Sequence, residues 1–380
     1  MSSLATQPLA NYRVNLVTGF LPEQDPLTCL PSYFAPWEQV AKQLSALLMA
    51  GKLRTVLERL PILGLQRLED ERQIHRAMLL LSVLGSAYVW GESAPAPRMP
   101  RGVAVPLWQV AERLSLPPIV THTQIALHNW QRLDKSQPVA LDNLAPLQLF
   151  LGGLDEQWFY MVIVAIEAEG GAAIAALVAA QPAAAANAVA VVVEKLQALE
   201  LTLVKMLALL NRMLEKCDPY VFYRRIRPFF AGWPSPGIIY EGVSETPQRF
   251  IGGSAAQSPL IQAIDAGLGV RHEKPETQQY LTEMRHYMLP VHRQFIAALE
   301  SGASIQAFVQ RQRQSCPVAV DHYNACLKAL DAFRKKHLEF SVRYISHQAK
   351  DEENVKGTGG TNFVSLLSEV RKETKARLIE

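Results

Sequence analysis

His337 is the histidine whose position in the sequence is best suited to metal chemistry. On a helix it shares a face with Leu330, Phe333 and Phe340, so its imidazole points toward an apolar interior. An unpaired basic ring in such a place costs free energy unless another group binds it. A single histidine on an apolar face is more often a packed core residue than a ligand, so both interpretations stay open.

Arg334 lies one turn before His337, on nearly the same side of the helix. In this pair one residue could ligate a metal while the other holds a carboxylate. Haem needs both functions, because its iron takes an axial nitrogen donor and its two propionates favour cationic partners. The pair therefore makes haem one candidate ligand of this helix.

His292 competes with His337 for the role of metal ligand. Met288, Phe295 and Leu299 give it an apolar face as well, and Arg293 beside it points about 100° away on a helix. Residue spacing alone does not separate the two candidates. Three of the other histidines, at positions 75, 272 and 347, lie among polar neighbours and are expected at the surface.

Two other kinds of segment could bind an anion. Residues 252–255 and 357–361 are rich in glycine and could present backbone N–H groups, although neither has nucleotide-loop spacing and both could be plain flexible loops. The basic run at 224–227 lies between aromatic residues, which is unusual for a solvated face. One arginine turned inward there could hold a small carboxylate with a flat apolar body, or the whole run could lie at the surface.

The composition limits the classes of partner. The chain has 380 residues, a formal charge of +3, 19% charged residues and 49% hydrophobic residues. We therefore expect a folded chain that does not bind nucleic acid. The four cysteines show no metal or redox spacing and the first residues lack an export signal, so we expect a cytoplasmic protein.

Helical periodicity predominates, which predicts an all-α fold. It predicts a small N-terminal helical domain at 1–145, with helices at 107–114 and 121–133, and a large C-terminal helical domain at 146–380. Residues 170–193 carry no charge and are long enough to span a bilayer, but they are mostly alanine and include Pro182 and Asn187. We interpret them as a close-packed pair of helices and expect no membrane span.

The chain resembles the indoleamine 2,3-dioxygenase family from about Asp25 to the C-terminus. Seven segments in family order carry the resemblance: LPPIVTHTQIALHNW (116–130), FFAGW (229–233), IIYEGV (238–243), FIGGSAAQSPLIQ (250–262), YLTEMRHYMLPVHR (280–293), FRKKHL (333–338) and KGTGGTNF (356–363). The resemblance implies a haem enzyme that opens the indole C2–C3 bond of L-tryptophan with O2 to give N-formylkynurenine. It also implies haem b, ferrous when active, an electron donor that keeps it so, and a small domain that caps the distal side.

The resemblance assigns a role to individual residues. His337 becomes the iron ligand in place of His292, and no protein acid or base is required. The haem periphery is assigned to Arg334, Asp265, Gly253 and Ser254. The substrate is assigned to Arg227 for its carboxylate, Phe159 and Phe222 for the indole, Ser254 and Ala255 in the loop over the haem edge, and Thr358 in a mobile loop at about 350–361.

Some positions of the substrate pocket depart from the better-known mammalian pattern of the family. Ile163 replaces a serine, His122 a tyrosine, Ile125 a cysteine and Phe230 a leucine. These changes keep two alternatives open. One is a haem enzyme that acts on another indole or aromatic amine, and the other is a haem or indole sensor without turnover.

Overall fold

The computed structural model describes residues 8–349, 357–358 and 360–380. Nearly all of its regular structure is helical, which confirms the all-α prediction. The α-helices are α1 (Ala35–Lys42), α2 (Leu44–Met49), α3 (Leu53–Leu57), α4 (Glu71–Trp90), α5 (Arg101–Leu114), α6 (Leu154–Ala185), α7 (Val189–Asn211), α8 (Met213–Lys216), α9 (Pro219–Val221), α10 (Pro259–Leu268), α11 (Pro275–Arg285), α12 (Pro290–Ser301), α13 (Ile305–Gln312), α14 (Pro317–Ser341) and α15 (Phe363–Lys375).

Short 3₁₀ and π-helical turns connect these helices, and the strands are only two residues long. The 3₁₀ turns are η2 (Leu9–Tyr12), η3 (Ser32–Phe34), η4 (Leu65–Arg67), η6 (Leu141–Asn143), η8 (Arg227–Phe230) and η9 (Ala255–Gln257), and the π-turns are η5 (Thr123–Leu127), η7 (Phe222–Ile226) and η10 (Val342–Ser346). Strand β1 (Arg98–Met99) pairs in parallel with β4 (Ile239–Tyr240), and β2 (Gln131–Arg132) pairs antiparallel with β3 (Leu144–Ala145).

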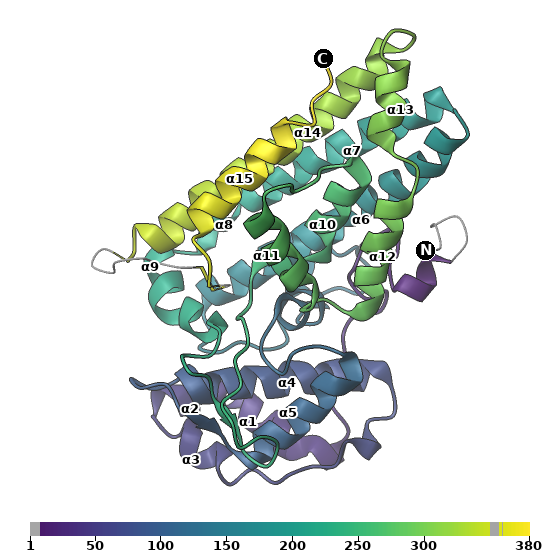
Figure 1. Ribbon diagram of the computed structural model, residues 1–380. Helices are drawn as coiled ribbons and strands as arrows, with labels where there is room; N and C mark the ends of the chain where they lie inside the picture. The colour runs from purple at the N-terminus through teal and green to yellow at the C-terminus, as the bar shows by residue number, and fades with distance from the viewer. Residues whose placement is uncertain (1–7, 350–356, 359) are drawn as a thin grey trace.

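Two groups of helices are visible in the ribbon view. Figure 1 shows α1–α5 packed together at one end of the molecule, with α6–α15 forming a longer tilted bundle at the other. Segments of the chain cross between the groups at several places, as the following two contacts show. Tyr12 of η2 packs on Phe295 of α12 with ring centroids 5.7 Å apart, and the pairing of β4 with β1 returns the chain to the smaller group. The domain boundary at 145/146 stays a prediction.

Helix α6 is the core helix of the larger group. It is long and apolar enough to span a membrane by composition, but 72% of its most apolar 18-residue window is buried inside the protein. Gly170 and Gly171 explain how closely its neighbours approach. A Cβ on Gly170 would lie 2.2 Å from Leu260 of α10, and one on Gly171 would lie 2.4 Å from the Val17 carbonyl. The helix-pair interpretation agrees with this burial, since α7 packs along α6 after a turn at Asn187.

The prediction of a helix over residues 121–133 is wrong. The chain makes only the π-turn η5 there and then enters strand β2. Side chains compete with the helix: Asn129 accepts hydrogen bonds from the backbone of Leu147 and Gln148, and the Trp130 indole donates to the Leu127 carbonyl. The contacts of Asn129 with a distant segment and the short-range hydrogen bond of Trp130 replace the local helical pattern.

Candidate functional site

One apolar cavity of about 310 Å³ lies inside the larger helix group and extends to η5. Its walls come from α6, α10, α14 and α15, from the turns η5, η7 and η8, and from the loop before α10. Every residue that the sequence analysis assigned to the site lines this cavity: His122, Ile125, Phe159, Ile163, Phe222, Arg227, Phe230, Gly253, Ser254, Ala255, Asp265, Arg334, His337 and Thr358. The structure thus brings them together, while their roles stay predictions.

Helix α14 positions His337 and Arg334 on the cavity wall, one turn apart. Burial lowers the pKa of His337 to about 4, so the imidazole is neutral at pH 7. The neutral ring is the form that binds a metal. Among the described residues, no hydrogen bond engages either of its ring nitrogens, which leaves a nitrogen lone pair for a ligand. This donor fits the iron of a haem.

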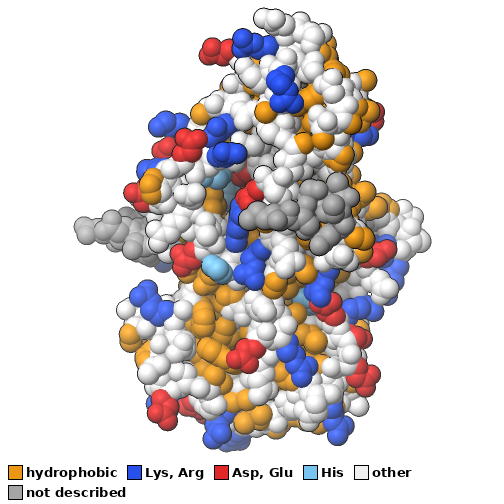
Figure 2. Space-filling model, turned by 45° about the vertical axis from the view of Figure 1, so that its right-hand side comes forward, with side chains coloured by type: hydrophobic (Ala, Val, Ile, Leu, Met, Phe, Trp, Pro, Cys, Tyr) orange, Lys and Arg blue, Asp and Glu red, His pale blue; other side chains and the backbone are white. Residues whose placement is uncertain are grey.

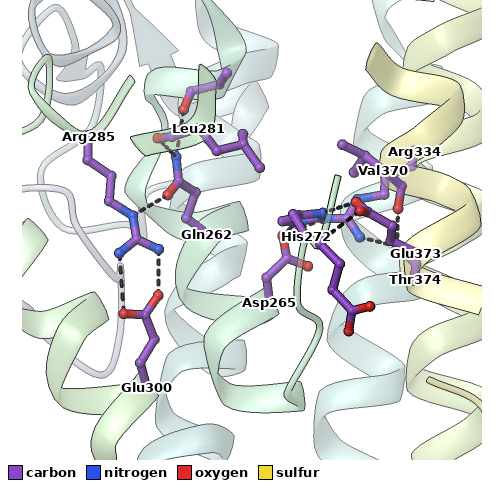
Figure 3. Close-up of polar contacts among 12 residues, drawn as sticks. Gln262, Asp265, His272, Leu281, Arg285, Glu300, Arg334, Val370, Glu373 and Thr374 are labelled. Atoms are coloured by element: carbon purple, nitrogen blue, oxygen red, sulfur yellow. Dashed lines mark hydrogen bonds and ion pairs between the residues drawn. The ribbon is translucent and has the colours of Figure 1, made fainter. Parts of the chain in front are cut away.

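Arg334 is held by a buried ion pair next to His337. Its Nη2 donates to Asp265 Oδ2 at 2.5 Å, and its Nη1 donates to the Thr374 hydroxyl of α15. His272 adds a second link, because its Nε2 lies 3.3 Å from Asp265 and its Nδ1 lies 2.6 Å from Glu373. Asp265 Oδ2 therefore contacts both basic groups, and Figure 3 shows these residues together.

The contacts of His272 correct the expectation that it lies at the surface. Its side chain is 10% exposed, and its hydrogen bonds to Asp265 and Glu373 raise its pKa against the opposing effect of burial. The Arg334 guanidinium holds the pKa of Asp265 below its usual range although the carboxyl is buried. Together the ion pairs connect α10, α14 and α15 behind the imidazole of His337. The sequence analysis missed this role of His272, which lies in the loop between α10 and α11.

A second polar group supports α10 from the other side. Arg285 of α11 donates to the Gln262 side chain at 2.7 Å and forms an ion pair with Glu300 of α12 at 2.5 Å (Figure 3). Gln262 in turn donates to the Ala256 carbonyl at 3.1 Å. The helix that carries Asp265 is therefore fixed to both neighbouring helices and to η9.

The opposite part of the cavity is aromatic. The ring centroids of Phe159 and Phe222 are 4.6 Å apart, and those of Phe159 and Phe230 are 5.8 Å apart. Arg227 begins η8, directly after the π-turn η7, and its guanidinium lies 5.2 Å from the ring centroid of Tyr223. A flat apolar ligand with an anionic group matches these walls.

The loop over this cavity is closely packed. Ser254 caps η9 by a reciprocal arrangement with Gln257, and a Cβ on Gly252 would lie 2.0 Å from the Phe230 carbonyl. The Thr358 hydroxyl donates to the Gly253 carbonyl at 2.6 Å, so this part of the glycine-rich segment closes on the loop. Most of the predicted mobile segment, residues 350–356 and 359, lies outside the described residues.

A buried carboxylate–imidazole pair, missed by the sequence analysis, faces the same cavity. His122 Nε2 lies 2.8 Å from Glu167 Oε1, which also accepts a hydrogen bond from Ser258 at 2.6 Å. Glu167 is 2% exposed, and its Oε2 has no partner among the described residues. Phe159, Ile163 and Glu167 follow one another at intervals of four, so they share a face of α6. This spacing could have predicted that Glu167 shares the helix face of Phe159 and Ile163.

His292, the residue that competed with His337 for the role of metal ligand, lies elsewhere. His292 and His75 line a separate cavity beside the N-terminal segment, and His75 is 6% exposed, which makes the prediction that it lies at the surface wrong. It is buried because its ring stacks on that of His128, with centroids 3.6 Å apart. His347 is exposed, as expected.

The fold and the cavity define an all-α protein that encloses an apolar site with a neutral imidazole on one wall. The chain belongs to the indoleamine 2,3-dioxygenase family, because the family model described as indoleamine 2,3-dioxygenase matches residues 8–377. It is therefore an oxidoreductase of the tryptophan/indoleamine 2,3-dioxygenase type, and haem is its cofactor.

Individual relatives are similar over nearly their whole length. Indoleamine 2,3-dioxygenase 2 of Homo sapiens is 34% identical, with 96% of this chain and 94% of the relative covered. Indoleamine 2,3-dioxygenase 1 of Rattus norvegicus is 33% identical, with 98% and 96% covered. A protein of Haliotis diversicolor named myoglobin is also 33% identical, with 98% and 99% covered.

Proposed function

We propose that this protein opens the indole C2–C3 bond of L-tryptophan with O2 to give N-formylkynurenine, using haem b bound through His337. The observation that carries the proposal is the cavity itself. It joins a neutral imidazole on α14 to an aromatic chamber that holds an arginine. Bound ferrous haem supplies the activation of O2, so the protein has to bind, orient and exclude water.

Arg334 and Asp265 would hold the periphery of the haem. Their ion pair is almost completely buried, with side chains 5% and 9% exposed, and Asp265 Oδ1 has no partner among the described residues. Gly253 and Ser254 present the loop at the edge of the same cavity. The donor set of one imidazole, one buried guanidinium and a glycine-containing loop suits a flat cofactor with anionic side groups.

Arg227 would bind the substrate carboxylate, and Phe159, Phe222 and Phe230 would enclose the indole. An arginine–carboxylate pair fixes the orientation of the bound carboxylate and neutralises its charge, since the guanidinium donates two parallel hydrogen bonds. Ile125 and Ile163 complete an apolar wall, and Ser254, Ala255 and Thr358 would close the chamber on the amino-acid side. Holding the ring in a reactive position supplies much of the catalysis in such a site.

His122 would accept the hydrogen bond of the indole N–H. An N–H group that enters an apolar chamber needs an acceptor, or it loses a hydrogen bond that water supplied. If Nε2 carries the proton and donates to Glu167, Nδ1 is left as an acceptor. Glu167 then acts as a positioning residue that fixes the tautomer of His122, and no protein group has to remove a proton.

The remaining parts of the proposal concern the surroundings of the enzyme. An electron donor would keep the haem ferrous, the group α1–α5 would cap the distal side, and the cytoplasm would be the compartment. Nucleic acid and membranes would not be partners. Lys, Arg, Asp and Glu side chains are mixed on the face seen in Figure 2, and the net charge is only +3, which supports this view.

The test is an assay of the reduced, haem-loaded protein with L-tryptophan and O2. We expect N-formylkynurenine in proportion to the O2 consumed. We also expect that His337→Ala loses the Soret band, whereas His347→Ala, a change at an exposed histidine, keeps it. Haem-loaded protein that binds tryptophan without forming product would overturn the proposal.

A second candidate is a haem protein without turnover, such as a sensor. The similarity to the Haliotis diversicolor protein named myoglobin favours it, since that protein matches this chain as well as the dioxygenases do. A third is turnover of a different indole or aromatic amine, which the residues His122, Ile163 and Phe230 motivate. Comparing product formation from tryptophan, tryptamine and halogenated tryptophans separates the three.

A further inference from the structure

A second cavity of about 130 Å³ lies outside the haem site, where the N-terminal segment meets the beginnings of α4 and α12. It has room for several water molecules, and therefore for one small ion with four oxygens. Three arginines and three histidines line it, with one carboxylate. Its lining residues are Arg13, Phe20, Pro22, Gln24, Pro26, Glu71, Arg72, His75, Arg76, His128, Leu289 and His292.

The charges of the lining arginines are only partly neutralised. Arg76 forms a buried two-point ion pair with Glu38 at 3.0 and 2.7 Å, and Arg13 pairs with Glu71. Arg72 donates to the Asp25 backbone carbonyl at 2.8 Å and has no carboxylate partner among the described residues. The cavity wall therefore carries an excess of positive charge.

Two buried nitrogens of the wall have no hydrogen-bond partner among the described residues. They are Arg76 Nη1 and His292 Nδ1, on side chains that are 5% and 1% exposed. The backbone of Arg13 engages the His292 ring, but it leaves Nδ1 unbound. A buried polar atom without a partner costs about 1–3 kcal/mol. Arg76 Nη1 and His292 Nδ1 are therefore available to bond a further group in this cavity.

Two helix N-termini meet at the cavity. Arg72, His75 and Arg76 lie in the first two turns of α4, and His292 lies in the first turn of α12, which has no side-chain cap. The Asp70 side chain caps α4, and the N–H groups of His292 and Arg293 bond the Leu289 carbonyl, so the two helix ends contribute the positive ends of their dipoles, which favour an anion.

The three histidines do not suit a metal ion. The rings of His75 and His128 are stacked 3.6 Å apart and within 8° of parallel, so an ion in the plane of one ring would lie out of the plane of the other. No group of three or more metal-binding side chains occurs in the part of the chain that the structure describes. Burial, together with neighbouring cationic groups, lowers the pKa of His75 and His128 and brings that of His292 to about 3.

We propose that this cavity binds one small tetrahedral oxyanion of the phosphate class, at the contact between the N-terminal segment, α4 and α12. Hydrogen phosphate matches both the arginine donors and the imidazole acceptor of the wall. Its oxygens accept hydrogen bonds from arginine, and its hydroxyl donates to a neutral imidazole nitrogen such as His292 Nδ1. Because α4 and α12 belong to different helix groups in Figure 1, the bound ion joins the two groups.

The experiment measures binding of inorganic phosphate to the haem-loaded protein, by calorimetry and by the shift of Tm, in a buffer without other multivalent anions. Phosphate is expected to raise Tm to a plateau, and sulfate, which has no hydroxyl to donate to His292 Nδ1, is expected to bind more weakly. Acetate and chloride, at matched ionic strength, are expected to give no plateau. Arg72→Gln is expected to weaken phosphate binding at least tenfold, while Arg59→Gln, which changes an exposed arginine outside the cavity, leaves it unchanged.

Three results would overturn the proposal. They are the absence of saturable phosphate binding, the same dissociation constant in Arg72→Gln and Arg59→Gln, and binding of acetate as tight as that of phosphate. Arg13→Gln is a second variant that leaves the hydrophobic core intact, and it should weaken binding as well because it frees Glu71 to repel the anion. Activity on tryptophan enters none of these measurements, so their outcome is independent of the proposed reaction.

Discussion

Replacing His122 by phenylalanine tests whether this imidazole recognises the indole N–H. The change keeps a ring of similar size in a side chain that is 4% exposed, and it removes the acceptor on that wall. A buried hydrogen bond contributes about 0.5–1.5 kcal/mol net. Since 1.4 kcal/mol is a factor of ten, its loss lowers kcat/KM for tryptophan about 2- to 12-fold.

The assay compares two substrates in each protein. One is L-tryptophan, and the other is the analogue in which the ring N–H is replaced by oxygen, so that it has no hydrogen to donate. The preference for tryptophan over the analogue should fall by the same factor in His122→Phe. Ile125→Val, a change on the same wall without a polar atom, should leave the preference as it is.

The substitution also removes one of the two hydrogen bonds to Glu167, which lowers the stability by about 1–3 kcal/mol. This loss affects both substrates equally, so it does not change their ratio, and an unfolding curve measures it separately. An equal fall in kcat/KM for tryptophan and for the oxygen analogue would refute the reasoning. Glu167→Gln should reduce the same preference, because the tautomer of the imidazole is then no longer fixed.

Three further predictions concern the supports of the site. Asp265→Ala leaves the buried Arg334 without its carboxylate and should lower the free energy of unfolding by about 3–5 kcal/mol in urea titrations; a loss below 1 kcal/mol would contradict the buried ion pair. The pKa of His272 is raised in the folded protein, so the protonated ring contributes to folding stability fully below its unfolded pKa, and this contribution is lost as the pH rises through the folded pKa. The Tm difference between the wild type and His272→Gln should therefore shrink between pH 6 and pH 9. A difference that grows over this range would contradict the prediction. Gly252→Ala should destabilise by about 1–3 kcal/mol because its Cβ meets a backbone carbonyl, whereas Gly253→Ala, whose nearest atom is 3.7 Å away, should be tolerated; equal effects in thermal unfolding would speak against the close packing.

The sequence predicts those features that depend on local spacing. The apolar face of residues 330–340 places His337 on the inner side of its helix, and the uncharged, alanine-rich residues 170–193 indicate closely packed helices. Local spacing alone left His337 and His292 equivalent, since both lie on apolar faces. What separates their surroundings is tertiary: one ring lines the large cavity and the other lines a small one.

The features that the sequence did not predict join distant parts of the chain. The contacts of Glu167 with His122 and with Ser258 join three distant parts of the chain, and no periodicity within one helix predicts them. His272 appeared solvated because its neighbours along the chain are polar, yet its partner Glu373 comes from α15. The residues around Asn129 have helix-forming neighbours but turn away to satisfy side-chain hydrogen bonds across 18 positions.

The three π-turns around the large cavity have a consequence for how such a chamber can arise. A π-turn contains one residue more than the α-helical turn that it replaces, and each residue of a helix rotates the chain by about 100°. Each of these turns carries a residue that lines the cavity: Ile125 in η5, Phe222 in η7 and Tyr344 in η10. Deleting one residue from η7 is expected to turn Arg227 by about 100° relative to the residues before it, and so to move its guanidinium from the place that it has in the cavity wall.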